Sequence, residues 1–214
     1  RIHNTLSRIN DLPEKDDLRQ WSPKARRNLR LAGDVSLIVS QKGTDIDNGV
    51  ETFTVPKLAL MVASPTLREL ILHEPEVLEI SLEGSNFEPT AVGILCYWLT
   101  SICNWNAQAL PYLPCPDDIF RALELRHAAQ ILCMDKYVRS FEIRYFLDIQ
   151  SRVPCLLEAV AVSSYALDVG DPVLNAWASR VGHLRRTSSL HQEYLEKLDD
   201  ILAMNQHQRL LEVL

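Results

Sequence analysis

The chain has 214 residues, of which 47% are hydrophobic and 23% charged, proportions typical of a globular protein with a substantial core. Its formal net charge of -6 argues against a dedicated nucleic-acid binder, because phosphate contacts need clustered Lys and Arg. No apolar run approaches the roughly 20 residues that span a bilayer, so we expect no membrane segment.

Residues 1–32 are expected to form an arm that contains one short basic helix. Ser22 followed by Pro23 predicts its start, with a capping hydroxyl and a first-turn proline, and Gly33 predicts its end. Three arginines on this helix form a candidate basic arm: Arg26, Arg27 and Arg30. A nuclear-import or DNA-touching arm is one interpretation, and a solvated helix face is the commoner one.

A β-hairpin is predicted next. Residues 34–39 are rich in β-formers, residues 42–50 form a polar loop, and residues 51–55 alternate polar and apolar side chains. Pro56 ends the second strand and can open a helix. Ser64 with Pro65 predicts a second short helix, and residues 77–82 predict a third strand.

The rest of the chain is predicted to be helical. Ser85 or Asn86 is expected to cap a helix over residues 87–98, and residues 104–116 form a loop with three prolines. Further helices are expected from Asp117 or Asp118 and over residues 136–149. Beyond Pro154 we expect three more helices. One covers residues 156–167, a second begins after Asp171 with Pro172, and a third begins at a capping box formed by Ser189 and Gln192.

These elements predict an α+β fold in three parts. Residues 1–32 are the arm, residues 33–150 hold a small three-stranded sheet with short helices packed on it, and residues 151–214 are an all-helical extension.

The ordered set of elements over residues 33–150 resembles a BTB/POZ domain. The segments that carry the resemblance are Asp34–Val39, Phe53–Leu60, Ala63–Pro65, Phe87–Thr100 and Leu123–Met134. Pro56 stands where animal members usually have His, which makes the chain similar to fungal members. The resemblance implies a domain that binds other polypeptides, itself included, and needs no reactive side chain.

In homodimeric members of that family, the positions that match Asp34 and Lys57 line a charged groove at the dimer interface. A buried pair there would define register more than it adds stability. The alternative is a local contact between hairpin and helix inside one monomer. Both interpretations stay open on the sequence.

Some family members bind a cullin through a hydrophobic-x-acid motif on the second short helix and recruit substrates for ubiquitination. Here Leu70, Ile71 and Leu72 occupy that place, and an acid is found only if the register slips to end at Glu74. Trp105, in the loop, is a further candidate contact with a partner protein.

The sequence lacks the residue patterns of common enzymes and metal sites. No two cysteines have the short spacing of a zinc site, and His127 and Cys133 are six residues apart on one expected helix, which favours an exposed His and a buried Cys. No Gly-x-Ser-x-Gly motif occurs. We therefore expect no enzyme, cofactor or metal.

The cysteine pattern also bears on the compartment. The five cysteines are odd in number and widely spaced, which suits reduced and buried thiols in an intracellular protein of the nucleus or cytoplasm.

Three functions are consistent with these patterns. The first is a protein-interaction module that self-associates or recruits a partner. The second is a substrate adaptor of a cullin-RING ubiquitin ligase, and the third is a chromatin-associated transcriptional regulator that uses the basic arm.

Overall fold

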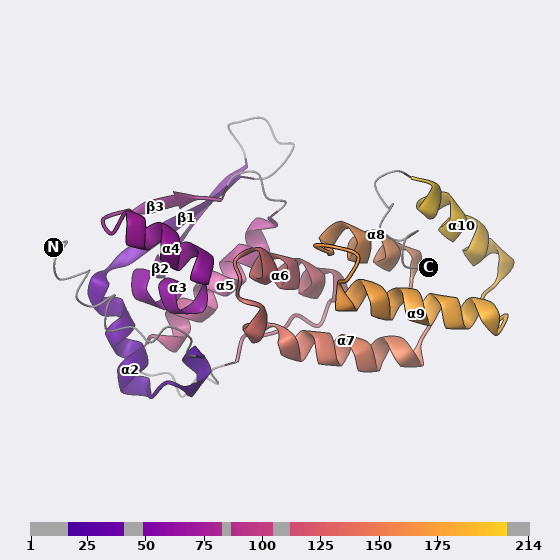
Figure 1. Cartoon of the computed structure of the whole chain (residues 1–214), viewed down its shortest axis with the longest axis horizontal. Helices are drawn as coiled ribbons and strands as arrows, with labels where there is room; N and C mark the ends of the chain where they lie inside the picture. Colours follow the sequence, from indigo (N-terminus) through magenta and orange to yellow (C-terminus); the bar gives the residue numbers. More distant parts are fainter. Residues whose placement is uncertain (1–16, 41–48, 83–86, 105–111, 205–214) are drawn as a thin grey trace. The chain divides into compact units, whose positions relative to one another are not determined.

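The computed structural model describes residues 17–40, 49–82, 87–104 and 112–204 (Figure 1). The fold is α+β, with one small sheet followed by helices, as the sequence predicted. The chain divides into two compact units: Arg1–Cys115 with Glu124–Val138, and Pro116–Leu123 with Arg139–Leu214. Residues 139–150 thus group with the later helices, whereas the predicted boundaries placed them with the sheet.

The sheet of the first unit has three strands in the order β2-β1-β3. β1 (Asp34–Ser40) pairs antiparallel with β2 (Val50–Pro56), which confirms the predicted hairpin. β3 (Glu79–Ser81) pairs parallel with β1. It is shorter than the predicted strand over residues 77–82, because only residues 36–38 of β1 pair with it. Alternate β1 side chains are buried, as a one-sided sheet requires.

Short helices complete the first unit. Their bounds are η1 Leu18–Gln20, α2 Pro23–Asn28, η2 Leu29–Ala32, α3 Lys57–Ala63, α4 Pro65–His73, α5 Pro89–Ile102 and η3 Asp135–Tyr137. Ser22 Oγ accepts from Ala25 N at 3.2 Å, and Ser64 Oγ accepts from Leu67 N at 3.2 Å, so both predicted caps are confirmed.

The predicted helix end at Gly33 is confirmed, whereas the predicted start of α5 is not. Gly33 follows η2 with φ 83°, a conformation that a glycine adopts without strain. The expected start of α5 at residue 87 is wrong, because the helix begins at Pro89 after Glu88, which caps it without a side-chain hydrogen bond. The predicted caps at residues 85 and 86 lie outside the described residues.

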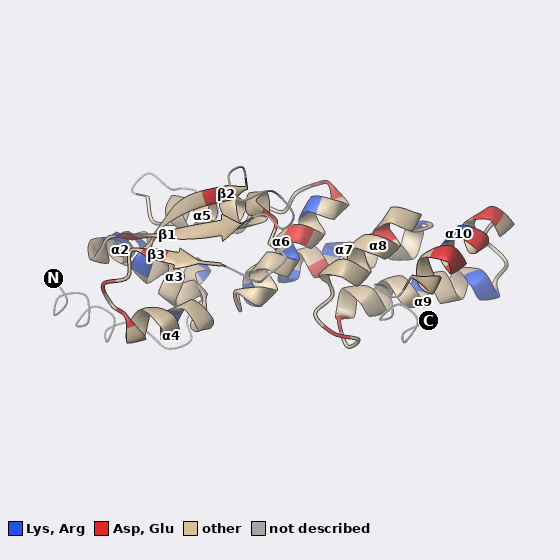
Figure 2. Ribbon diagram, turned by 90° about the horizontal axis from the view of Figure 1, so that it is seen from above, with Lys and Arg blue, Asp and Glu red and all other residues tan. Residues whose placement is uncertain are grey.

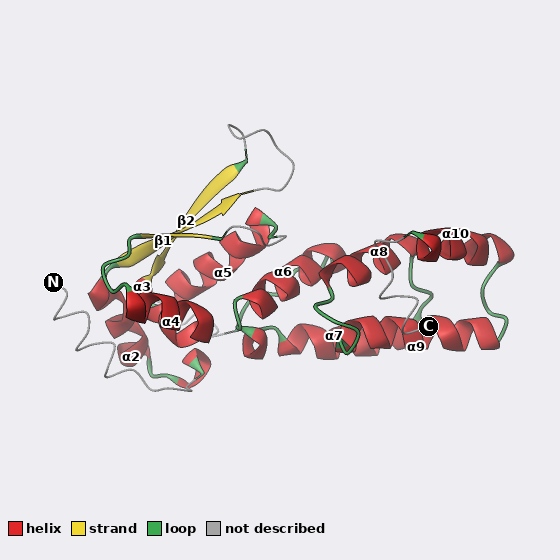
Figure 3. Ribbon diagram, turned by 45° about the horizontal axis from the view of Figure 1, so that its top comes forward, coloured by secondary structure: helices red, strands yellow, loops and turns green. Residues whose placement is uncertain are grey.

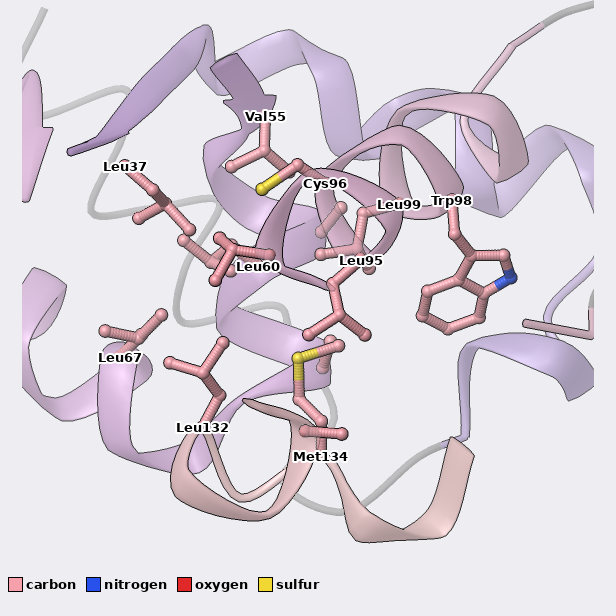
Figure 4. Close-up of a cluster of buried hydrophobic side chains, with 14 of the residues drawn as sticks. Leu37, Val55, Leu60, Leu67, Leu95, Cys96, Trp98, Leu99, Leu132 and Met134 are labelled. Carbon is pink, nitrogen blue, oxygen red and sulfur yellow. The ribbon is translucent and has the colours of Figure 1, made fainter. Parts of the chain in front are cut away.

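The core of the first unit lies between the sheet and the helices. All seven residues of α3 are buried, and Leu37 and Val55 from the hairpin meet Leu60 and Leu95 in the cluster of Figure 4. Each such large side chain stabilises the fold by about 1.5–3 kcal/mol when it leaves water. This packing holds the strands and short helices as one body.

The second unit is built from helices in its described residues (Figure 3). Their bounds are α7 Arg139–Ser151, α8 Leu156–Tyr165, α9 Pro172–Arg186 and α10 Gln192–Ala203, while α6 Ile119–Ile131 belongs to both units. The helix predicted over residues 136–149 begins at Arg139, since a 3-10 turn precedes it. None of the described helices has the length and apolar character needed to cross a membrane.

Three helix starts test the predicted caps of this part of the chain. Asp118 Oδ1 accepts from Arg121 N at 2.9 Å, and Asp171 Oδ1 accepts from Val173 N at 2.9 Å, in agreement with the sequence. The predicted capping box at Ser189 is wrong, because His191 is the N-cap of α10 and makes no side-chain hydrogen bond there.

Candidate functional site

Asp34 and Lys57 lie at the same end of the sheet. Asp34 opens β1 opposite Pro56, the neighbour of Lys57, and is exposed, whereas Lys57 opens α3 and is buried. Lys57 Nζ donates to Pro75 O at 2.9 Å. Burial lowers the pKa of the Lys57 ammonium from its usual value, and the Glu76 carboxylate offsets part of that effect.

Hydrogen bonds join three chain segments at this end of the sheet. Lys57 N donates to Gly33 O at 3.0 Å, and Ser36 N donates to Leu78 O at 2.8 Å. Leu31, Asp34 and Leu78 are exposed on these segments, and we call them the sheet-end patch. The neighbouring Glu76 and Glu79 are exposed as well. Exposed leucines on hydrogen-bonded segments are candidate contacts with another protein.

The expected cullin-facing residues on α4 do not share one face. Ile71 is fully buried in the core, because with Leu67 it forms the inward side of α4, so its assignment to a partner surface is wrong. Leu70, Leu72 and Glu74 are exposed. Figure 2 marks acidic residues on the segment that connects α4 with β3.

The candidate basic arm is only partly at the surface. Arg26 is 6% exposed, and its Nε and Nη1 have no hydrogen-bond acceptor among the described residues, so the interpretation of a solvated face is wrong for it. The reason is that α2 packs against α5. Arg27 is half-buried, and Arg30 is exposed and donates from Nη1 to Asn104 Oδ1 at 2.6 Å. Trp105 lies outside the described residues.

His127 and Cys133 have the opposite of their expected exposures. His127 is buried because α6 is enclosed on most of its circumference, and Cys133 is exposed just after the helix end. Cys133 has φ 54°, and Thr66 Oγ1 donates to its Sγ at 3.1 Å. Among the described residues, no group of three His, Cys, Asp or Glu could hold a metal ion.

The remaining thiols divide in the same way. Cys155 is exposed like Cys133, so the expectation of buried thiols holds for Cys96 and Cys103 alone. Cys115 has intermediate exposure.

The second unit contains a buried ionic network that the sequence patterns did not predict. Glu158 is 1% exposed, and its carboxylate accepts from Tyr145 Oη at 2.8 Å and from both terminal nitrogens of Arg152 at 2.7 and 2.9 Å. Arg152 Nε also donates to Asp148 at 2.5 Å. Each charge of the network is paired and hydrogen-bonded, which is the arrangement that buried ions require.

A groove runs between α7 and α9, within the second unit. Its volume is about 700 Å³. It is lined by Phe146, Ile149 and Gln150 from α7 and by Pro172, Asn175, Ala176, Ser179, Arg180 and His183 from α9. The two helices are far apart in sequence, so no short motif could have indicated it.

When compared with known proteins, the chain matches no protein-family model and no functionally curated protein.

Proposed function

We propose that the chain is a protein-interaction module of the BTB/POZ kind, acting inside the cell, in nucleus or cytoplasm, which self-associates through the sheet-end patch and recruits partners. The observation that carries the proposal is the exposure of Leu31 and Leu78 on segments held together beside Asp34. A patch of this kind loses its unfavourable contact with water when a second polypeptide covers it.

The β3 edge of the sheet favours association through side chains over strand addition. β3, an edge strand, has only three residues, and a strand this short offers few unpaired backbone groups to another chain. β2, the other edge strand, packs against α5. The exposed leucines beside the strands are then the groups that a partner copy would bury.

The proposal is tested by the mass of the protein in solution. Light scattering during gel filtration should give a dimer for the native chain and a monomer for Leu78→Asp, because a carboxylate in a buried interface is costly. Leu157→Asp is the matched control, since Leu157, on α8, is 70% exposed and Leu78 is 69% exposed. A native protein that stays monomeric at 100 µM, a chosen assay concentration about 100-fold above a micromolar Kd, would contradict self-association.

A cullin adaptor is a second candidate function. Its specific support is that the slipped register of the expected motif, Leu72 and Glu74, is exposed at the end of α4. Binding of a purified cullin N-terminal domain that is lost in Leu72→Glu and kept in Leu157→Glu would support this function. Equal binding by both variants would rule out the α4 surface.

The chromatin-associated regulator has weaker support, because Arg26 is buried and only Arg27 and Arg30 of the candidate arm reach the surface. The suitable test is a salt-dependent DNA mobility shift that the double variant Arg27→Glu with Arg30→Glu abolishes.

A further inference from the structure

We infer that the groove between α7 and α9 is the docking site for an amphipathic helix of a partner protein that carries acidic residues at one end. The inference names a kind of partner for the proposed interaction module and rests on that function. It concerns the second unit alone and is independent of the sheet-end patch.

The two helices that form the groove pack against each other and run in the same direction (Figure 1). Arg180 Nε, near the middle of α9, donates to Arg152 O, just beyond the end of α7, at 2.9 Å, so the C-terminal end of α7 is joined to the middle of α9. Two packed helices leave a surface furrow that a third helix can fill, which is the helix-in-groove mode of recognition. The volume of about 700 Å³ lies in the usual range for ligand sites.

The apolar surface continues from the groove onto its α7 side. Ile143 and Leu147 are 55% and 68% exposed and lie one turn apart. They are three residues before Phe146 and Gln150 respectively, both of which line the groove, so the four share one side of the helix. Apolar side chains exposed together along a groove are more consistent with a docked apolar stripe than with bulk water.

The charge of the lining residues is one-sided. The ionisable residues among those that line the groove are Arg180 and His183, one turn apart toward the C-terminal end of α9. The opposite end is formed by Pro172, Asn175 and Ala176, which are uncharged. The bond from Arg180 Nε to Arg152 O orients the guanidinium, and a carboxylate is the group that a guanidinium binds best.

The length of the lined stretch gives the size of the docked segment. Pro172 to His183 spans eleven residue steps of α9, which at 1.5 Å per step is about 16 Å, or three turns of a docked helix. Such a helix would place apolar side chains at spacings of three and four over Phe146 and Ala176 and its acidic end at Arg180.

The test uses the full chain and two fluorescein-labelled synthetic peptides. Both probes are helix-forming, span about four turns and carry one leucine stripe; one ends in two Glu and the other in two Lys. Fluorescence anisotropy should show the Glu probe binding at least about tenfold more tightly than the Lys probe. Amide shifts of the labelled protein should move at Gln150, Ser179 and His183.

Two variants with exposed positions on α9 locate the site. Ser179→Glu places a carboxylate among the lining residues and should weaken binding of the Glu probe by about tenfold. Arg186→Glu is the control, because Arg186 is exposed on the same helix outside the lining, and its larger charge change should alter binding less than about threefold at physiological salt.

Three results would overturn the inference: equal binding of both probes, undiminished binding by Ser179→Glu, or no binding of the Glu probe at millimolar concentration. A native dimer that Ser179→Glu dissociates would show instead that a second copy occupies the groove. The oligomeric state of the native chain separates this inference from the proposed self-association. If the native chain is monomeric but still binds the Glu probe, self-association fails while the groove inference stands.

Discussion

The buried carboxylate of Glu158 gives a direct probe of what holds the second unit together. The substitution Glu158→Gln keeps the size of the side chain and removes the charge that faces both terminal nitrogens of Arg152. Removing one partner of a buried ion pair costs about 3–5 kcal/mol. Arg152 is 31% exposed at its side chain and keeps Asp148, so we expect a loss of about 2–3 kcal/mol in the free energy of unfolding.

Differential scanning calorimetry converts this loss into a temperature. For a chain of 214 residues, about 2–3 kcal/mol corresponds to a fall of about 4–12 °C in its Tm. The matched control is Glu193→Gln, which breaks the fully exposed i,i+4 pair with Lys197 and should leave the Tm unchanged. If both variants unfold at the native Tm, Glu158 does not stabilise the unit and the reasoning from burial is refuted.

Three more outcomes are expected from the structure. Gly93→Ala should lower the free energy of unfolding by about 1–3 kcal/mol, because the new Cβ would lie 2.8 Å from the Phe53 ring. Urea titration should show that the double variant Gly93→Ala with Phe53→Leu regains part of the lost free energy of unfolding. Burial raises the pKa of Tyr194 to about 12 from 10.0, so the folded state keeps a proton that the unfolded chain loses. The stabilisation present below pH 10 should therefore be lost as the pH rises toward 12, and Tyr194→Phe should make the urea midpoint less dependent on pH in that window. Iodoacetamide should label exposed Cys133 in the folded protein and Cys96 only after unfolding, because burial raises the pKa of the Cys96 thiol to about 12. Mass spectrometry detects the labelled sites, and equal labelling rates at the two thiols would contradict the burial of Cys96.

Local chemistry explains which parts of the fold the sequence predicts. Ser22, Ser64 and Asp171 cap helices through bonds to nitrogens two or three residues away, so their roles are written in short stretches of sequence. The hairpin pairs neighbouring segments, and Gly33 supplies the left-handed backbone at the end of η2. The fold class follows from these local elements and their order.

The errors concern side chains whose environment comes from distant residues. His127 was expected to be exposed and Arg26 to lie on a solvated face, but both are buried, and α2 packs against α5. Cys133 is exposed because the chain reverses after α6 at a residue other than glycine, a position that composition does not mark.

The same limit applies to the candidate sites. The groove between α7 and α9 depends on how two helices from separate stretches of the chain pack, and the network around Glu158 joins residues from two helices. The exposure of Leu78 depends on the short pairing of β3 with β1. Periodicity identifies such elements but not which of their faces another element covers.

The mass of the protein in solution tests the central proposal most directly. Gel filtration with light scattering should give twice 24.4 kDa for the native chain and for Leu157→Asp, and 24.4 kDa for Leu78→Asp. A native mass of 24.4 kDa at every concentration, or dimers that persist in Leu78→Asp, would contradict association through the sheet-end patch.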